Sequence, residues 1–529
     1  MDLRKPVIFV TGAATLALEL VASRAMTPYF GVSLFIWAGI LSTTLVCLAT
    51  GYWLGGAVAR RAGPAGANAL FATAPAVAGL LLGMAAAVYP DLFPGLARLH
   101  LALGSVLACA VLLGPALIAL SAMNPLLVAA LRPEKGQAGD AGAGAVFAWS
   151  TFGSVAGVAV AAAALIPNLG NFHSVLAIAG LLGALSLLGA LSSGMDGRWR
   201  RRAAWSGAGA VVLVLALLML SAAERRALES GAGRLGYRIV ETVPTGFGSL
   251  RVVDIGRDLA GPPEEIQRFL LADGMNMGAE DLAGRPTVAF AYALEAIALG
   301  HPAPRTALML GLGMGSVPDL LTARGIEVDV VEINPAVVDL AERHFGFDRS
   351  SVTLYLEDAR LFARRCPRRY DAVLIDLFSG DGIPDHLVTA EFFADLKRNC
   401  LAHGAVIGFN TLYGPSAPPA RSVLVGTIVD SFGPAAVMRD GGRADAVGNA
   451  YVAVPPTSYR TDVFRAAPPP VRERLERAFA DPVVVTTADF PPRTALTDDF
   501  NTYPYRAMGD QIAYRRSVVR ALPPALLVN

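Results

Sequence analysis

At 529 residues, the chain is longer than one ordinary domain. Hydrophobic residues make up 54% of the sequence and charged residues only 16%, which excludes an ordinary soluble protein along the whole length. The net charge of +1 argues against nucleic acid as a partner. Because charges are sparse up to Ala223 and common after it, we expect a membrane half followed by a soluble half.

Cysteine and histidine are too few and too scattered to predict a metal site. The four cysteines, which form no CxxC pair, are Cys47, Cys109, Cys366 and Cys400. The six histidines do not cluster. We therefore expect neither a disulfide framework nor a bound metal.

Seven apolar stretches fill the membrane half, each near the roughly 20 residues that cross a bilayer as a helix. They cover residues 6–23, 34–58, 69–89, 101–131, 144–166, 171–193 and 203–223. The fourth is long and contains Pro115 and Pro125, so we expect either a kinked helix or a span joined to an interfacial piece.

Small residues recur at helical spacing in two of these stretches. Gly51 and Gly55 lie in the second stretch, and Gly153 and Gly157 lie in the fifth. This spacing predicts close packing of neighbouring helices.

Basic residues flank the seven stretches unevenly. Two, Arg24 and Arg98, fall on one side of the membrane, and ten fall on the other: Arg4, Lys5, Arg60, Arg61, Arg132, Lys135, Arg198, Arg200, Arg201 and Arg202. The asymmetry predicts a cytoplasmic N-terminus, and seven spans would then place the soluble half outside the cytoplasm.

The soluble half is expected to hold a small β unit and a larger α/β domain. After a linker at 224–235, β-prone runs at 248–254 and 268–274 predict an antiparallel unit within 236–285. From 286 to 515, alternating helices and strands are typical of a parallel sheet. We expect helices at 286–299, 335–345 and 390–401, and strands at 306–309, 328–331, 353–356, 372–376 and 405–409.

A glycine-rich turn follows the first of these parallel strands. It reads Gly311-Leu312-Gly313-Met314-Gly315, and the next strand ends on Glu332. A strand, a tight glycine turn, a helix and an acid at the next strand end are typical of a nucleoside pocket. The turn alone fits dinucleotide and adenosylmethionine folds alike.

Acids follow the carboxyl ends of three successive strands. Glu332 ends one, Asp358 follows the next, and Asp376 ends the third. Ligands of open α/β sheets bind at that edge, where Glu332 can accept ribose hydroxyls and Asp358 the adenine amine. A strand-end acid can instead cap the next helix. Three acids in series favour a pocket, and Asp358 favours an adenosylmethionine-type nucleoside over a dinucleotide.

These features resemble the spermidine synthase family of polyamine aminopropyltransferases, and especially its membrane-fused members. The similar segments are Glu19–Gly31, Tyr237, Leu271–Gly274, the helix around Tyr292, Gly311–Gly315, Val331–Glu332, Glu357–Ala359, Tyr370–Asp376, Leu387–Phe393 and Leu496–Asp499. The fold expected is a multi-span α-helical membrane domain at 1–223, then a Rossmann-like α/β domain of the adenosylmethionine methyltransferase type at 286–515, preceded by the small β unit.

The resemblance implies transfer of an aminopropyl group from decarboxylated S-adenosylmethionine to an amine such as putrescine, giving a spermidine-like product and methylthioadenosine. It implies nucleoside binding by Gly311, Gly313, Gly315, Glu332, Asp358 and Ala359, catalysis by Asp376, and amine binding by Tyr237, Asp273, Tyr292 and Asp381. The attacking amine must be neutral, so a carboxylate that accepts a proton suits Asp376.

The expected co-substrate is decarboxylated S-adenosylmethionine, with no permanently bound cofactor or metal. The expected partners are the small-molecule amine, the donor and the lipid bilayer of the cell membrane, and a homo-oligomer is compatible with the sequence. A nucleoside made in the cytoplasm conflicts with a domain outside it. Either one span is miscounted or the domain does face out.

The sequence also departs from the family pattern. Met314 replaces the aspartate of the family loop, Ala293 and Leu294 replace the residues after the tyrosine of Tyr-His-Glu, and Arg238 replaces a glutamine. Most of these losses fall on the acceptor side, so an acceptor other than putrescine is compatible with the sequence. Two alternatives stay open: a methyltransferase that uses intact adenosylmethionine, and a polyamine transporter or sensor without turnover.

Overall fold

The computed structural model describes residues 3–31, 34–99, 101–135, 142–190, 196–230, 236–378, 380, 382–413, 422–440, 447–457, 459–492 and 495–528. The chain forms two compact units. One comprises Met1–Ala227, Pro244–Ser249 and Val519–Asn529, and the other comprises Leu228–Val243 and Leu250–Val518.

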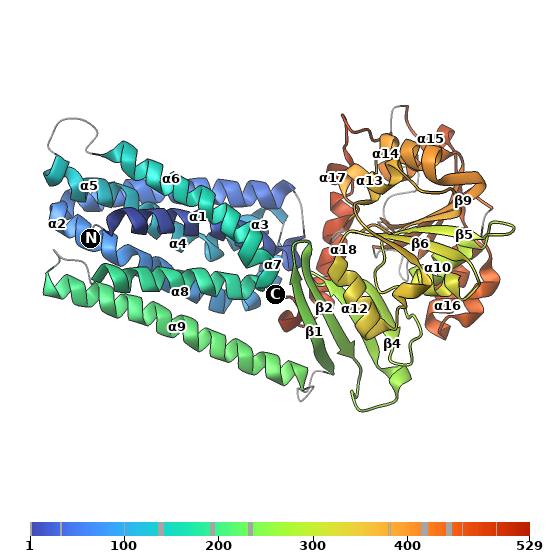
Figure 1. Ribbon diagram of the computed structural model, residues 1–529, viewed down its shortest axis with the longest axis horizontal. Coiled ribbons are helices and arrows are strands. Elements are labelled where there is room, and N and C mark those ends of the chain that lie inside the picture. The colour runs from blue at the N-terminus through green and yellow to red at the C-terminus, as the bar shows by residue number, and fades with distance from the viewer. Residues whose placement is uncertain are drawn as a thin grey trace. The chain divides into compact units, whose positions relative to one another are not determined.

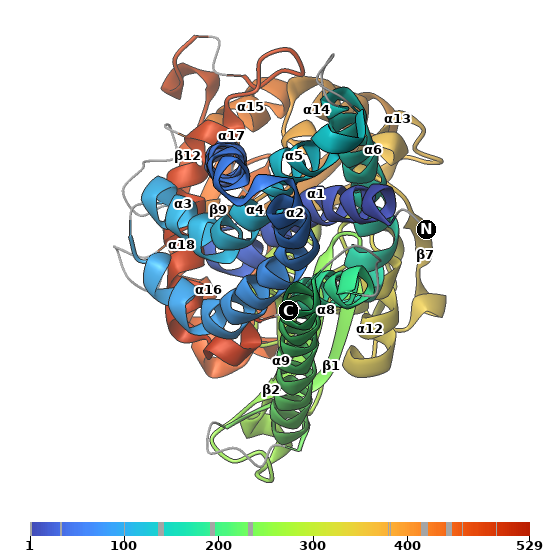
Figure 2. The same ribbon diagram turned by 90° about the vertical axis from the view of Figure 1, so that its left-hand side faces the viewer.

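The first unit consists mainly of long apolar helices (Figures 1 and 2). The long helices and the short ones between them are α1 (Arg4–Phe30), α2 (Leu34–Leu96), α3 (Leu101–Leu112), α4 (Gly114–Ser121), α5 (Met123–Lys135), α6 (Ala143–Val160), η1 (Ala161–Leu165), α7 (Ile166–Asn168), α8 (Asn171–Ala190) and α9 (Gly197–Glu229). Among the described residues, six helices are long and apolar enough to cross a membrane. They indicate a multi-pass membrane region.

Two of the seven expected stretches, 34–58 and 69–89, lie within the single element α2. This element is broken at Gly63, where the backbone is not helical (φ 67°, ψ 178°). The fourth stretch is interrupted as expected, because α4 begins just before Pro115 and α5 just before Pro125. Residues 224–229, which we expected in a linker, extend α9 instead.

Glycines allow the backbones of α1 and α6 to touch. A Cβ on Gly153 would lie 1.9 Å from the carbonyl oxygen of Phe9, and one on Gly157 would lie 2.1 Å from that of Ala13. Gly51 makes a similar approach to Ser121, whose Oγ would lie 1.8 Å from an added Cβ. The close helix packing expected at these spacings is confirmed.

The soluble half begins with a four-stranded sheet in the order β1-β2-β3-β4. Its strands are β1 (Tyr237–Thr245), β2 (Gly248–Ile255), β3 (Gln267–Ala272) and β4 (Met275–Asp281). The pairs β2–β3 and β3–β4 are antiparallel. Asp273 and Gly274 join β3 to β4 with φ of 45° and 80°, the positive values that a two-residue hairpin turn favours. The small β unit is confirmed.

An eight-stranded sheet follows, in the order β12-β10-β11-β9-β8-β5-β6-β7. Its strands are β5 (Thr306–Leu310), β6 (Glu327–Glu332), β7 (Thr353–Leu356), β8 (Tyr370–Ile375), β9 (Leu401–Tyr413), β10 (Ala435–Asp440), β11 (Gly448–Val454) and β12 (Val483–Val485). Strands β5 to β9 are parallel, as expected. The antiparallel extension β10–β12 lies beyond the last strand we expected.

Helices cover both faces of this sheet, so the fold is Rossmann-like (Figure 1). One core contains residues of α10 (Ala289–Ala298), α11 (Ser316–Thr322), α12 (Pro335–Phe345) and α16 (Pro469–Ala480). The other contains residues of α13 (Ala359–Arg364), α14 (Ala390–Asp395) and α15 (Val423–Phe432). The remaining elements are η2 (Pro263–Glu265), η3 (Arg349–Ser351), η4 (Asp385–Leu387), η5 (Leu396–Cys400), η7 (Thr461–Ala466), η8 (Thr487–Asp489), α17 (Tyr503–Arg506), α18 (Met508–Ala521) and η9 (Pro524–Leu526).

One disulfide joins Cys366 to Cys400, so the expectation that the cysteines form no disulfide is wrong for this pair. The two residues are 34 apart in the chain, but they lead into neighbouring parallel strands, in which Tyr370 pairs with Leu401. Strand pairing, which the cysteine spacing does not reveal, brings the two thiols together.

Candidate active site

Four of the expected site features lie side by side at the carboxyl edge of the larger sheet. Strands β8, β5, β6 and β7 are neighbours in that order. Asp376 follows β8, the glycine turn follows β5, Glu332 ends β6, and Asp358 follows β7. Neighbouring strands are about 4.8 Å apart, so the row from Asp376 to Asp358 is about 14 Å long. That length suits a nucleoside with an extended substituent.

The glycine turn lies directly against the backbone of Asp376. The N–H of Asp376 donates to the carbonyl of Leu310 at 3.0 Å. Gly311 has φ of 90°, and a Cβ there would lie 2.2 Å from the carbonyl oxygen of Asp376. Gly315 also has positive φ (92°), and its Cβ would lie 2.7 Å from the ring of Phe347. Glycine is therefore needed at both positions to form the turn itself, in addition to letting a ligand approach the backbone.

Gly313 is the middle glycine of the turn, and it faces the smaller sheet. Its φ is 59°, and a Cβ there would lie 3.2 Å from the carbonyl oxygen of Met277 in β4. Met314 is buried, and its sulfur would lie 2.7 Å from a Cβ on Gly278. The side chain that replaces the family aspartate therefore packs against β4.

Glu332 is buried and is held by backbone donors on both sides. One carboxylate oxygen accepts from the N–H of Leu312 at 3.0 Å, and the other accepts from the N–H of Asn334 at 2.8 Å. Burial raises the pKa of Glu332, and these hydrogen bonds oppose the shift. Each oxygen keeps a lone pair that can accept a hydroxyl of a bound sugar.

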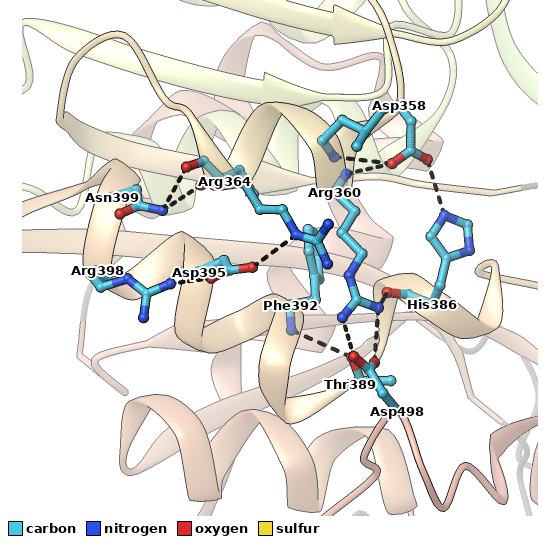
Figure 3. Close-up of polar contacts among 12 residues, drawn as sticks. Asp358, Arg360, Arg364, His386, Thr389, Phe392, Asp395, Arg398, Asn399 and Asp498 are labelled. Atoms are coloured by element: carbon cyan, nitrogen blue, oxygen red, sulfur yellow. Dashed lines mark hydrogen bonds and ion pairs between the residues drawn. The ribbon is translucent and has the colours of Figure 1, made fainter.

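Asp358 caps the helix α13. Its Oδ1 accepts from the N–H groups of Arg360 and Leu361, and its Oδ2 lies 3.0 Å from Nε2 of His386 (Figure 3). Burial would raise the pKa of Asp358, but the hydrogen bonds from His386 and the backbone lower it below its ordinary value. Asp358 therefore does cap the next helix, which was the alternative to a ligand-binding role. Only Oδ1 takes part in the cap, whereas Oδ2 contacts His386. Ala359 is the buried first residue of the same helix.

Arg360 links this end of the site to the segment around Asp498. The guanidinium donates to the carboxylate of Asp498, at 2.8 Å for Oδ1, and to the carbonyl of His386 at 3.0 Å (Figure 3). Thr389 caps α14 beside it by accepting from the N–H of Phe392. The segments around His386 and Asp498 are thus fixed to the helix that Asp358 caps.

Asp376 is held by Asn410, which is held in turn by Asn449, and neither asparagine was expected from the sequence. Asn410 donates from Nδ2 to Oδ1 of Asp376 at 2.9 Å, and Asn449 donates to Oδ1 of Asn410 at 3.0 Å. The other oxygen of Asp376 accepts no hydrogen bond from the residues the structure describes. Burial raises the pKa of Asp376 to about 6, and the bond from Asn410 opposes this shift. The result is an oriented carboxylate that can exchange a proton near neutral pH.

A signal for Asn410 was present in the sequence, since it directly follows the strand expected at 405–409. The acids were selected because they lie at the carboxyl ends of expected strands, and the same criterion would have selected Asn410. Asn449 had no such signal, because it lies on β11, which pairs antiparallel with β9 and was not expected.

Three of the four residues expected to bind the amine lie within the described part of the chain. Tyr237 is buried at the start of β1, and Asp273 is a hairpin-turn residue whose carbonyl accepts from Arg515 at 2.7 Å. Tyr292 is buried in α10 and donates its hydroxyl to the carbonyl of Pro286 at 3.1 Å. Asp381 lies outside the described residues. Amine binding by these residues stays a prediction.

A cavity of about 390 Å³ lies at the same edge, on the face covered by α10. Its lining residues are Gln267, Phe269, Asn276, Ala279, Thr287, Val288, Ala289, Phe290, Asp440, Val447, Gly448, Asn449, Tyr451, Arg474 and Tyr514. Asn449 belongs both to this wall and to the pair of asparagines that holds Asp376.

Two curated relatives are similar to this chain over about a quarter of its length. A polyamine aminopropyltransferase from Vibrio vulnificus is 38% identical over 135 residues, covering 24% of this chain and 45% of the relative. Polyamine aminopropyltransferase 2 from Hyperthermus butylicus is 30% identical over 146 residues, covering 26% and 48%. Part of this chain is a polyamine aminopropyltransferase-like domain. The chain spans less than half the length of these relatives.

The aminopropyltransferase-like domain also has a methyltransferase relative. An N-terminal histidine N-methyltransferase from Emericella nidulans is 36% identical over 138 residues, covering 24% of each chain. The crystal structure of a probable spermidine synthase from Corynebacterium glutamicum aligns with 47% of this chain and 91% of its own, at 16% identity and a TM-score of 0.37. No family model matches the chain.

Proposed function

We propose that the protein is a membrane-anchored aminopropyltransferase. It would move an aminopropyl group from decarboxylated S-adenosylmethionine to an amine and release methylthioadenosine. The observation that carries this proposal is the carboxylate of Asp376, oriented by Asn410 at the end of the row that starts at Asp358. The similarity to polyamine aminopropyltransferases supports the same reaction class.

In the proposed step, the acceptor nitrogen attacks the aminopropyl carbon bonded to sulfur. The nitrogen lone pair forms the new C–N bond, the C–S bond breaks, and its electron pair returns to sulfur, so the sulfonium becomes a neutral thioether. The nitrogen then carries one extra proton, which Asp376 accepts and passes to water. The negative charge of Asp376 would also favour the sulfonium in the pocket.

The other acids of the row would bind the nucleoside. Glu332 would accept the ribose hydroxyls with the lone pairs that its backbone donors leave open. Asp358 would accept the adenine amine through Oδ2, in place of or beside His386. The glycine turn between Asp376 and Glu332 would lie under the sulfur-bearing part of the donor.

The test is release of methylthioadenosine by the full chain, purified in detergent, with decarboxylated S-adenosylmethionine and a panel of amines. We expect release that depends on both the donor and an amine, and an equal amount of aminopropylated product. Donor binding without release with any amine would instead favour a binding protein, such as a polyamine transporter or sensor.

A methyltransferase is the second candidate, and the specific observation that favours it is Met314. Its side chain is a thioether that is buried against β4, so this position has no carboxylate that could bind the free amine of the decarboxylated donor. The similarity to a histidine N-methyltransferase points the same way. Calorimetry with intact and decarboxylated adenosylmethionine separates the two candidates, and we expect tighter binding of the decarboxylated form.

We also propose that the soluble half faces outside the cytoplasm, in which case the donor, which is made in the cytoplasm, would have to cross the membrane to reach the site. Basic residues favour a cytoplasmic N-terminus, and α2, broken at Gly63, is long enough for two spans, which makes the number of spans odd. The disulfide between Cys366 and Cys400 supports an oxidising compartment. A topology reporter fused after Asn529 should be active outside; activity in the cytoplasm would overturn this assignment.

A further inference from the structure

The cavity of about 390 Å³ has the size of a small-molecule site, and hydrogen bonds connect its wall to the candidate base Asp376. Asn449 lines it and donates to Asn410, which in turn donates to Asp376. Tyr451, also in its wall, pairs directly with Asn410 across β11 and β9. An acceptor whose nitrogen reaches Asp376 would therefore extend its other end over β9 and β11 into this cavity.

Among the described residues of the cavity wall, Asp440 is the single acid, and its carboxylate is already engaged. It is 4% exposed and accepts from Nε of Arg474 at 2.9 Å, from Nη2 of Arg474 at 2.8 Å and from the hydroxyl of Tyr451 at 3.0 Å. A carboxylate has about four acceptor sites, and three are used here. The wall thus offers little to a second ammonium group, which would be costly to bury without a counter-charge.

Of the wall residues that the structure describes, Arg474 is the single base, and it retains unused donors. Its Nε and Nη2 bind Asp440, whereas Nη1 makes no hydrogen bond with the described part of the chain. The side chain is 44% exposed, so a ligand can reach it. A guanidinium carries five N–H donors, and those left open match the two oxygens of a carboxylate.

Neutral groups of the wall can complete the recognition of an anion. Thr287 has a buried Oγ1 without a hydrogen-bond partner among the described residues, and Asn449 keeps one amide hydrogen after binding Asn410. Both can donate to a carboxylate oxygen. These two groups therefore add neutral donors to those that Arg474 leaves open.

We infer that the acceptor is an amine carrying a carboxylate at its far end, and that Arg474 determines this specificity. The inference rests on the proposed aminopropyl transfer and concerns only the acceptor. The product would be an N-(3-aminopropyl) amino acid, formed together with methylthioadenosine and one proton. Putrescine would be a poor acceptor, because its second ammonium would face Arg474.

The test compares three acceptors with the full chain in detergent: 5-aminopentanoate, putrescine and butylamine. The first two differ in having a carboxylate or an amine after four methylenes, and the third lacks a charged far end. We expect kcat/KM for 5-aminopentanoate to exceed that for putrescine by about tenfold or more, the scale of one charge-assisted hydrogen bond. An equal or higher value for putrescine would overturn the inference.

Variants of Arg474 test whether this residue determines the preference for an acceptor with a carboxylate. Arg474→Gln should lower the ratio of kcat/KM for 5-aminopentanoate to that for butylamine by about tenfold, and Arg474→Lys should restore part of it. Since Arg474→Gln leaves Asp440 buried without its partner, the double variant Asp440→Asn with Arg474→Gln gives a neutral pair as a folding control. Arg477→Gln, on the same helix and outside the wall, should leave the ratio unchanged.

Binding of the amines is measured separately from turnover, so that failure of the inference can be distinguished from failure of the proposed function. Calorimetry uses the Asp376→Asn variant saturated with methylthioadenosine. Binding of 5-aminopentanoate but not putrescine supports the inference, even if no turnover is found. The absence of turnover would then contradict only the proposed transferase activity. Binding of putrescine alone, or of neither amine, overturns the inference, and release of methylthioadenosine with putrescine would leave the proposed function intact.

Discussion

The nucleoside end and the acceptor end of the candidate site are built differently. At the nucleoside end, the glycine turn, Glu332 and Asp358 each lie at the carboxyl end of a parallel strand, so the local sequence is enough to predict their positions. At the acceptor end, Asp376 is oriented by Asn410 and Asn449, which come from a different stretch of the chain. At the nucleoside end, the same feature, a site residue at a strand end, recurs from one parallel strand to the next. The acceptor end depends instead on which distant strands pair.

The largest effect is expected at the junction of the two ends, for Asp376→Asn. Loss of the proton acceptor should lower kcat for methylthioadenosine release by about 10²–10⁴-fold, the usual contribution of a general base. Binding of methylthioadenosine should change little, because the nucleoside end is intact. Asp339→Asn, which alters an exposed carboxylate on α12, is the matched control. Equal rates for the two variants would remove Asp376 from the mechanism.

Gly311→Ala should break the contact between the glycine turn and Asp376. The new Cβ would meet the carbonyl oxygen of Asp376 at 2.2 Å, so we expect a loss of about 3 kcal/mol in the free energy of unfolding. Gly325→Ala is the control, since Gly325 also has positive φ (78°) but no atom within 4 Å of an added Cβ. It should cost only about 1 kcal/mol, and denaturant titration of both variants compares them. Similar losses would show that the close approach is unimportant.

Glu332→Gln tests the nucleoside end by itself. The amide keeps the size of the side chain, but its NH₂ group would face a backbone N–H donor, either that of Leu312 or that of Asn334. We expect the Kd for methylthioadenosine to rise by about tenfold, measured by calorimetry, while the preference among acceptors stays as in the parent chain. A changed acceptor preference would mean that the two ends are not separate.

The smallest effect concerns pH. Burial raises the pKa of Asp376 to about 6, and the base acts only when ionised, so kcat/KM should rise as pH increases through about 6. Asn410→Ala removes a hydrogen bond that lowers this pKa, so its midpoint should shift to higher pH. A midpoint that is unchanged in Asn410→Ala would argue against Asp376 as the titrating group.

The same pKa shift predicts how stability depends on pH. Folded Asp376 binds its proton more tightly than the unfolded chain does, because its pKa is raised. Its contribution to stability should therefore be complete below the ordinary pKa of an aspartate, near 4, and be lost as pH rises through about 6. Denaturant titrations of the parent chain and Asp376→Asn between these values measure the difference.

Much of the fold could be predicted because its signals are local. The apolar stretches, the breaks near Pro115 and Pro125, the small β unit and the parallel strands each follow from composition over a short window. The disulfide could not be predicted in this way, since Cys366 and Cys400 meet only when β8 pairs with β9. The same limit applies to Asn449 and to Arg474, which reaches Asp440 from a helix 34 residues further along the chain.

The sequence by itself determined the division into an apolar helical half and an α/β half, and the acids at successive strand ends, because periodicity and strand-end position are properties of short segments. Only the tertiary structure decided that Asp376 is held by Asn410 and Asn449, and that the neighbouring cavity presents an arginine whose carboxylate partner is already bound. Those contacts depend on strand order and register, which join segments that no local pattern connects.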